Sequence, residues 1–209
     1  MGKHSGSIDS QVLARIRRKR PGVVFGPKDF LDLGTRNAVG LALMRHCRAG
    51  TIRRVGRGLY DVPAAHPLIG TLAPDVERTL RTKLEQEGHA LAPTGAHAAN
   101  LLGLTEQVPM RMVYLTDGPG RTVQVGDVEV VLKNTGSRFL ATRTRIGALV
   151  IQALRHWGRT NTGDREYKLL RSRIPYEGRQ ELLKDLKAAP AWIADIMRRL
   201  AQEPHTPQP

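Results

Sequence analysis

The segment from Thr35 to Val62 constrains the fold of this chain more than any other stretch of its sequence. Thr35 can cap the start of a helix, because its hydroxyl oxygen can accept one of the unpaired backbone N–H groups there. Gly50 can end that helix, because glycine adopts the left-handed conformation of a helix terminus without steric cost. Between them, apolar residues recur at helical spacing, at Val39, Ala42, Leu43 and Cys47. The sequence therefore predicts a helix between Thr35 and Gly50.

A basic hairpin is predicted directly after this helix. Thr51–Val55 and Leu59–Val62 are rich in β-forming residues, and Gly56-Arg57-Gly58 between them suits a tight turn. Upstream, the pattern predicts a helix from Ser7 or Asp9 to about Arg20, a strand at Val23–Phe25 and a helix at Pro27–Leu33. The order helix, strand, helix, helix, hairpin is typical of a winged helix-turn-helix, which we expect over residues 1–64.

The positive charge of the chain is concentrated on the same segment. The net charge is +14, and the isoelectric point is near 10.8. Residues 1–62 carry 13 Lys and Arg against 4 Asp and Glu, whereas residues 63–146 carry 9 against 8 and residues 147–209 carry 11 against 7. A basic excess on a predicted DNA-binding fold favours double-stranded DNA as the partner. A basic protein whose charge serves only solubility is the alternative.

Composition narrows the cellular setting and the classes of partner. One cysteine cannot form an internal disulfide, which favours the reducing cytoplasm. Aromatic residues make up only 4% of the chain, which argues against an RNA binder that stacks bases on rings. No apolar run reaches the roughly 18–20 residues of a membrane span, and no apolar segment typical of a signal peptide follows the N-terminal MGKHSGS. We therefore expect a cytoplasmic protein with no membrane partner.

A second domain is expected over residues 70–202, after a linker at Pro63–Pro67. The predicted elements are helices at Asp75–Gly88, Thr94–Leu104 and Arg145–Trp157, strands at Met110–Thr116, Thr122–Val125 and Val128–Leu132, and three helical pieces between Asp164 and Leu200. Residues 203–209 are expected to form a disordered tail. The predicted fold class is α+β, with a winged helix-turn-helix followed by a mixed α/β domain that has a small antiparallel sheet and C-terminal helices.

The outer face of the helix after Thr35 supplies the first candidate DNA contacts. At about 100° per residue, the face opposite Val39 and Leu43 carries Asn37, Leu41, Met44 and Arg48, with Arg45 alongside. Residues near the start of such a helix suit contacts with base edges. Arg45, Arg48 and the hairpin residue Arg57 suit contacts with phosphates.

The complete set of candidate DNA-binding residues is Thr35, Arg36, Asn37, Met44, Arg45, Arg48, Arg53, Arg54 and Arg57. Asn37 is equally compatible with a solvated surface, and Thr35 with a capping role first. Arg53 and Arg54 alternate on a predicted strand, so only one of them can face DNA. The sequence leaves open which one does.

Signals of an active site are weak. Cys47 falls on the apolar face of its helix, where a buried structural thiol is expected, and His46 is expected at the edge of the core. The seven histidines lack paired metal-ligand spacing, and no glycine-rich phosphate loop is present. Asp127, Glu129 and Lys133 are faintly similar to the strand of a metal-dependent nuclease, but a third carboxylate is missing. We therefore predict no enzymatic activity, no metal and no cofactor.

The chain resembles the AbiEi antitoxin family of type IV toxin–antitoxin systems, which is linked to abortive infection. The resemblance is carried by GVVFGPKDFLDLGTRNAVGLALMRHCRAGTIRRVGRGLYDVP, by APTGAHAANLLGLTEQVP with the YLTDG strand after it, and by the helical APAWIADIMRRL. The RAGTIRRVGRGLYD wing is its most specific part. Together these pieces span most of residues 20–200.

The resemblance implies a bacterial protein with two roles. The N-terminal winged helix would act as a transcriptional repressor of its own operon, usually by binding inverted repeats in the promoter. The C-terminal domain would counteract a nucleotidyltransferase-like toxin encoded beside it, and direct contact with that toxin stays open. The alternative is a stand-alone transcription regulator whose C-terminal domain senses a ligand or mediates assembly.

Overall fold

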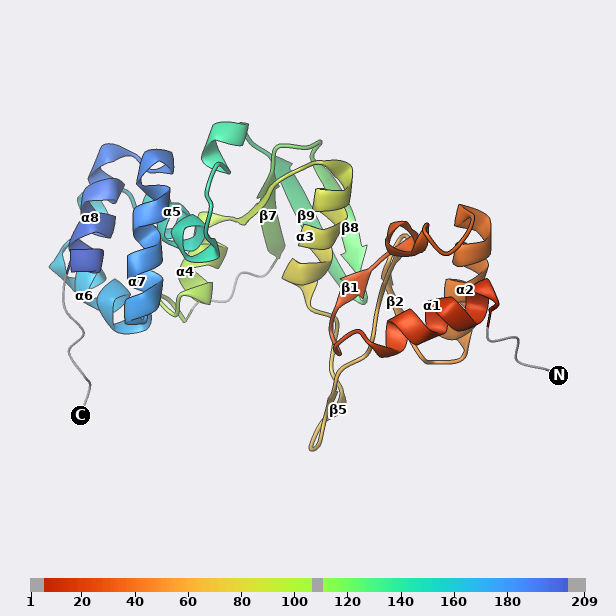
Figure 1. Cartoon of the computed structure of the whole chain (residues 1–209). Coiled ribbons are helices and arrows are strands. Elements are labelled where there is room, and N and C mark those ends of the chain that lie inside the picture. Colours follow the sequence, from red (N-terminus) through yellow and green to blue (C-terminus); the bar gives the residue numbers. More distant parts are fainter. Residues whose placement is uncertain (1–5, 107–110, 203–209) are drawn as a thin grey trace. The chain divides into compact units, whose positions relative to one another are not determined.

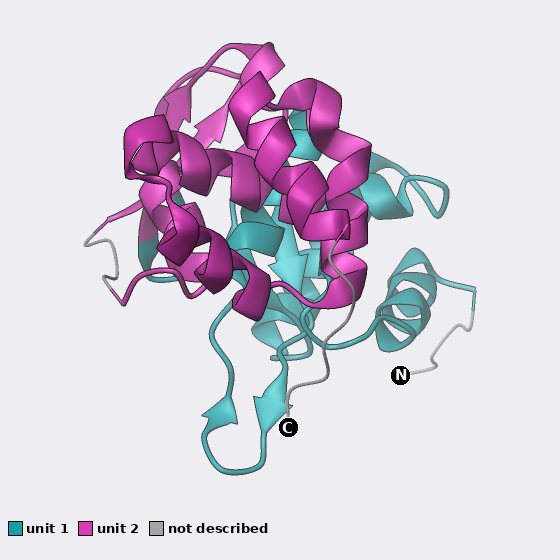
Figure 2. Cartoon of the chain, turned by 90° about the vertical axis from the view of Figure 1, so that its left-hand side faces the viewer, with its two compact units in different colours: residues 1–88, 124–128 teal, residues 89–123, 129–209 magenta. Residues whose placement is uncertain are grey.

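The structure, a computed structural model, describes residues 6–106 and 111–202, which form two compact units (Figures 1 and 2). One unit contains the residues up to Gly88 together with Gln124–Val128, and the other contains His89–Val123 and the residues from Glu129 onward. Both combine helices with a small sheet, so the α+β class is confirmed. The expected tail at residues 203–209 and the first residue of the strand expected from Met110 lie outside the described residues.

The first unit begins with three helical elements and a small sheet. Its elements are α1 (Ile8–Arg17), β1 (Val24–Phe25), the 3₁₀ turn η1 (Pro27–Phe30), α2 (Arg36–Arg48), β2 (Arg53–Gly56) and β3 (Leu59–Asp61). The strands form an antiparallel sheet in the order β1-β3-β2. The predicted helix after Thr35 and the predicted basic hairpin are thus confirmed.

Local capping explains where these helices begin. The Ser7 hydroxyl accepts the Ser10 amide at 3.2 Å, and the Thr35 hydroxyl accepts the Ala38 amide at 3.3 Å. The buried faces of α1 and α2 then pack with the sheet around one hydrophobic core of Val12, Ile16, Phe25, Phe30, Val39, Ala42, Leu43 and Ile52. The apolar face predicted for the helix after Thr35 is therefore confirmed at Val39, Ala42 and Leu43.

The helix expected at Pro27–Leu33 is wrong in type and length, because η1 is a single 3₁₀ turn. The Asp29 carboxylate accepts the Gly26 amide at 2.7 Å and closes this turn on itself. The chain then has only a few residues before Thr35, which is extended because it caps α2. The amides of Asp29 and Leu33 bond the carbonyls of Gly26 and Phe30, three residues back, so the stretch forms tight 3₁₀-type turns and not an α-helix.

The first unit continues past the expected boundary near residue 64. The residues expected as a linker enter a small hairpin of β4 (Ala65–His66) and β5 (Gly70–Thr71), and α3 (Val76–Glu87) follows. α3 starts at the cap residue Asp75 and ends at Gly88, whose φ of 81° is left-handed. It buries Leu80 and Leu84 and contacts β1. The predicted division into residues 1–64 and 70–202 thus falls within this unit, and as a division into folding domains it stays a prediction.

Most of a four-stranded sheet lies in the second unit, and the turn between its last two strands, Gln124–Val128, belongs to the first unit. The strands of this sheet are β6 (Leu91–Pro93), β7 (Met112–Thr116), β8 (Arg121–Val125) and β9 (Val128–Asn134), in the order β6-β7-β9-β8. β6 and β7 pair antiparallel, but β7 and β9 pair parallel. The small antiparallel sheet that was expected is therefore a mixed one, because β9 inserts between β7 and β8 instead of extending the sheet at its edge.

Helices complete the second unit. They are α4 (Gly95–Leu101), α5 (Arg145–Trp157), α6 (Asp164–Arg173), α7 (Tyr176–Glu181) and α8 (Ala191–Gln202), with 3₁₀ segments η2 (Ser137–Phe139), η3 (Arg159–Asn161) and η4 (Leu182–Ala188). α5 is the most buried of them, and α4, η3, η4 and α7 all contact it. The helical pieces predicted between Asp164 and Leu200 are confirmed, and they close the core around α5 (Figure 1).

Candidate nucleic-acid interface

The outer face of α2 is exposed along its whole length. Asn37, Leu41, Met44 and Arg48 follow one another at helical spacing and are all exposed. Leu41 is 49% exposed and Met44 is 38% exposed, although both are apolar. The predicted outward orientation of this face is confirmed. It combines an amide, two apolar side chains and a cation, which are the groups that read base edges and phosphates in a DNA groove.

The N-terminal end of α2 is also open to solvent. Thr35, Arg36 and Asn37 are exposed, and the Thr35 hydroxyl serves as the helix cap. The side chains of Arg36 and Asn37 make no hydrogen bond or ion pair with another described residue. They are therefore available to a ligand that approaches the start of the helix.

Arg57 lies at the tip of the β2–β3 hairpin. It is exposed, it has no ion-pair partner among the described residues, and it precedes Gly58, whose φ of 71° makes the tight turn possible. Arg54, three residues earlier on β2, is exposed as well. Its Nε donates a hydrogen bond to the Gly56 carbonyl at 3.3 Å. The hairpin thus presents two exposed guanidinium groups, one on the strand and one at the tip.

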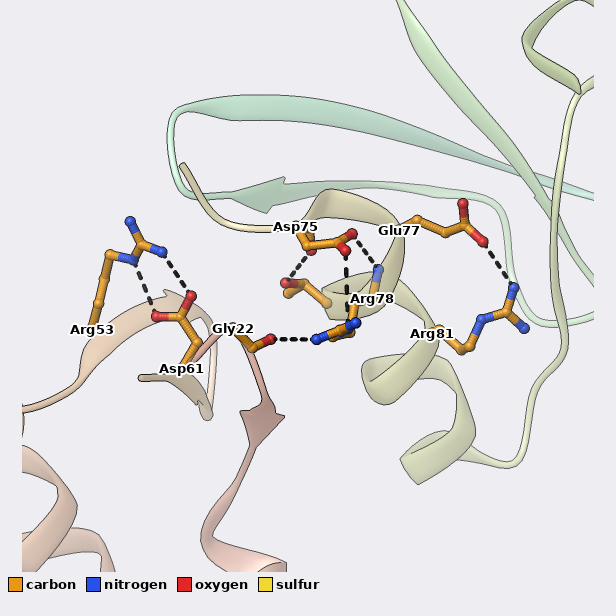
Figure 3. Close-up of polar contacts among 8 residues, drawn as sticks. Gly22, Arg53, Asp61, Asp75, Glu77, Arg78 and Arg81 are labelled. Carbon is orange, nitrogen blue, oxygen red and sulfur yellow. Dashed lines mark hydrogen bonds and ion pairs between the residues drawn. The ribbon is translucent and has the colours of Figure 1, made fainter. Parts of the chain in front are cut away.

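Arg53 is half-buried, and its guanidinium group is paired with the Asp61 carboxylate (Figure 3). Its Nε donates to Asp61 Oδ1 at 3.1 Å and its Nη2 to Asp61 Oδ2 at 2.7 Å. Its Nη1 donates to the Leu72 carbonyl at 2.8 Å. Asp61 is only 2% exposed, so its charge requires this partner. Of the two alternating arginines, Arg54 is the one that the fold leaves exposed.

Asp61 is the ion-pair partner of Arg53, and the sequence alone did not identify it. It lies directly opposite Arg53 in the β2–β3 register. Opposite charges at facing positions of a hairpin attract each other. The β2–β3 register is therefore enough to predict this ion pair. The same unit holds α3 by further polar contacts (Figure 3). The Arg78 guanidinium donates to the Gly22 carbonyl at 3.1 Å and lies 3.9 Å from the Asp75 carboxylate, which accepts the Arg78 backbone amide at the helix start.

Arg45 and His46 both face Asp9 of α1. Arg45 is exposed and lies 3.4 Å from the Asp9 carboxylate, a distance typical of a weak surface ion pair. His46 is buried, and its Nε2 lies 3.6 Å from the same carboxylate. The predicted position of His46 at the edge of the core is confirmed. Arg45 remains exposed enough to reach a phosphate.

The basic run from Arg15 to Arg20 divides into two groups. Arg15 forms a two-pronged ion pair with Asp32, with distances of 2.7 and 2.6 Å, and the Lys19 ammonium lies 5.2 Å from the centre of the Phe25 ring. Arg17, Arg18 and Arg20 are exposed. Only these last three add freely to the positive surface of the unit.

The described residues contain no group of three or more His, Cys, Asp and Glu side chains placed to hold a metal ion. Cys47 is half-buried against the core of the first unit, so it is less buried than the sequence predicts. Among the helices that the structure describes, none is long and apolar enough to cross a membrane.

The chain is similar to one family of proteins and to a solved structure. A family model described as a family of unknown function, DUF6088, matches residues 11–182, from within α1 to the start of η4. No curated protein matches the chain. Among solved structures, the RV2827C protein from Mycobacterium tuberculosis is similar, with 20% identity, a TM-score of 0.43 and coverage of 96% of this chain and 83% of that one.

Proposed function

This chain belongs to DUF6088, a family of unknown function, and we propose that it binds double-stranded DNA through its first unit. The unit would act as a winged helix, with α2 in the major groove and the β2–β3 hairpin on the neighbouring backbone. One observation carries the proposal: the exposed face of α2 and two exposed hairpin arginines occur together in the segment where 13 Lys and Arg meet only 4 Asp and Glu.

The position of each side chain in the unit determines the role that we propose for it. Arg36 and Asn37 contact base edges, because they are exposed and unpaired at the start of α2, and Met44 contacts a thymine methyl group. Phosphates are bound by the exposed cations farther along the helix and on the hairpin, namely Arg45, Arg48, Arg54 and Arg57. Arg53 supports the hairpin from inside through Asp61 and does not contact DNA in this proposal.

The biological role follows from the sequence resemblance. We propose that the chain represses its own operon by binding inverted repeats in the promoter, and that its second unit counteracts a nucleotidyltransferase-like toxin. The resemblance of the RAGTIRRVGRGLYD segment to the AbiEi wing supports the first role. The second rests on the weaker resemblance of the segments that form α4, β7 and α8. A stand-alone transcription regulator is the alternative.

DNA binding is tested by titrating the full chain against the DNA upstream of its own gene at several salt concentrations. If the four proposed phosphate-binding cations and the exposed Arg17, Arg18 and Arg20 contact phosphates, about six to eight contacts form. The slope of log affinity against log salt should then lie between about −5 and −7, because each contact contributes about −0.9. A slope near zero, or no shift of the DNA at low salt, would refute the proposal. Asn37→Ala should relax the preference at one base position, whereas Arg57→Ala should weaken all sequences alike.

The antitoxin role is tested by co-expression with a nucleotidyltransferase-like toxin encoded beside the gene. The full chain should restore growth, and Arg57→Ala should restore it as well when both genes are expressed from a foreign promoter, because rescue then needs no repression. Failure of the wild-type chain to rescue growth, with intact DNA binding, would favour the stand-alone regulator.

A further inference from the structure

A second concentration of cations surrounds a pocket inside the second unit. The pocket has a volume of about 750 Å³ and lies between the segment around η2, the last turn of α5 and the segment η4. Five cationic side chains line it: Arg138, Arg143, Arg155, Lys184 and Lys187. They come from three separate stretches of sequence, so the fold brings them together.

The single carboxylate in the lining does not pair with these cations. Asp185 is buried, and its oxygens accept hydrogen bonds from the Arg143 amide, the Thr144 amide and the Thr144 hydroxyl. Asp185 thus holds the two residues that precede α5 and is satisfied by these donors, so it does not neutralise the cations of the lining.

Four of the five cations lack an ion pair. Lys184 lies 3.5 Å from the Glu181 carboxylate, but Arg138, Arg143, Arg155 and Lys187 make no ion pair with any residue that the structure describes. Like charges that converge on a cavity repel one another, and the repulsion is weaker when a counter-ion lies between them. The lining therefore has an unbalanced positive charge, which an anion from solution could neutralise.

Arg138 and Arg155 are held in position by an aromatic ring. The guanidinium carbon of each lies 4.7 Å from the centre of the Phe139 ring, a distance typical of a cation–π contact. Burial lowers the pKa of Arg155, and the neighbouring charge of Arg138 lowers it further. Both effects penalise the charged guanidinium, and a bound anion would offset both.

We propose that this pocket binds a small molecule that carries two or more phosphate groups. Guanidinium groups match phosphate oxygens in a two-pronged geometry, and four unpaired cations exceed what one singly charged anion can balance. The volume falls in the range of about 300–1,000 Å³ found for pockets that enclose small ligands. A small ligand fits better than a nucleic-acid strand, because all five cations line one pocket.

The experiment measures binding of inorganic triphosphate to the full chain by calorimetry. Arg143→Gln and Lys187→Gln should each lower the affinity about tenfold, as expected when one charge-assisted contact is lost. Arg165→Gln is the matched control, since Arg165 is an exposed arginine of α6 outside the pocket lining, and it should leave the affinity unchanged. Both pocket residues are exposed, so the variants should fold, which thermal unfolding would verify.

Two results would overturn the proposal: no binding of triphosphate at millimolar concentration, or equal affinities in the wild-type chain and both pocket variants. Comparison of inorganic triphosphate with a nucleoside triphosphate then separates two sources of the same chemistry, and binding of either one supports the site. Tighter binding of a single-stranded oligonucleotide of equal charge, lost in Arg143→Gln, would replace the small molecule by a nucleic acid and contradict the proposal. Because the readout contains no duplex DNA, its failure leaves the proposed DNA binding untouched.

Discussion

The two units use the same kind of residue in opposite ways. In the first, exposed arginines occur along one helix and one hairpin, at Arg36, Arg48, Arg54 and Arg57. In the second, cations from η2, α5 and η4 converge on one pocket. A linear polyanion such as DNA can meet the first arrangement, because its phosphates repeat along a line. A compact anion meets the second, because its charges lie within one cavity.

The net charge of a segment does not predict how many of its cations are available to bind an anion. Residues 1–62 have the largest basic excess, yet two of their arginines, Arg15 and Arg53, are engaged in two-pronged ion pairs with aspartates of the same unit. The pocket lies in a part of the chain with a smaller excess, and most of its cations are unpaired. Pairing therefore decides which cations remain for a ligand.

The largest expected effect separates the two anion sites. Reversing both exposed hairpin charges, in Arg54→Glu with Arg57→Glu, should lower affinity for duplex DNA by about a thousandfold, because two attractions become repulsions. The same variant should bind inorganic triphosphate like the wild-type chain. Gel-shift titration and calorimetry on one preparation provide the two readouts.

The matched control reverses two exposed arginines of the second unit outside the pocket, in Arg159→Glu with Arg165→Glu. It changes the net charge by the same amount, so a similar loss of DNA affinity in the control would mean that total charge, and not the hairpin, determines binding. Loss of triphosphate binding in the hairpin variant would break the comparison from the other side.

The next largest effect is on stability, and it distinguishes Arg53 from Arg54, the two neighbouring arginines of β2. Asp61→Ala should lower the free energy of unfolding by about 3 kcal/mol, because it leaves the partly buried Arg53 guanidinium without its partner. Arg54→Ala should change that free energy by less than about 0.5 kcal/mol, as is usual for an exposed side chain. Chemical denaturation of the two variants measures both values.

DNA binding should show the reverse order. Arg54→Ala weakens it, whereas Asp61→Ala leaves it nearly unchanged at a temperature where the first unit is folded. If Arg53→Ala weakens DNA binding more than Arg54→Ala does, in chains that are equally folded, then Arg53 leaves Asp61 to contact DNA and the division drawn from the structure is wrong.

The sequence predicted the elements whose ends are determined locally. The Thr35 cap, the left-handed Gly50 and the Gly56-Arg57-Gly58 turn each depend on a few neighbouring residues, and the structure confirms α2 and the hairpin at those positions. The outer face of α2 followed from the same helical spacing. Local chemistry was enough to predict most of the first unit and the orientation of its candidate contacts.

Features that depend on distant residues were missed. Whether Arg53 or Arg54 is exposed depends on Asp61 and on the Leu72 carbonyl, and neither contact follows from alternation alone. The parallel β7–β9 pair depends on the position of β9 in the sheet. The pocket brings Arg138, Arg155 and Lys187 together by helix packing, so no spacing in the sequence indicates it.

The smallest expected effect concerns the ion pair that removes Arg15 from the positive surface. The hydrogen bonds from Arg15 lower the pKa of Asp32 below its ordinary value of 3.8, and the same pair raises the pKa of Arg15. Because the pKa of Asp32 is lower in the folded chain than in the unfolded one, the pair stabilises the fold above about pH 4. This contribution is lost as the pH falls through the lowered value.

An NMR titration of the Asp32 carboxyl carbon checks this sign. Its midpoint should lie below 3.8 in the wild-type chain and should rise towards that value in Arg15→Gln, which removes the donor's charge. The shift should shrink at high salt, because both side chains are exposed and screened. A midpoint that is identical in the two chains would show that Arg15 is free in solution. Arg15 would then belong with Arg17, Arg18 and Arg20 among the cations available to the proposed DNA interface.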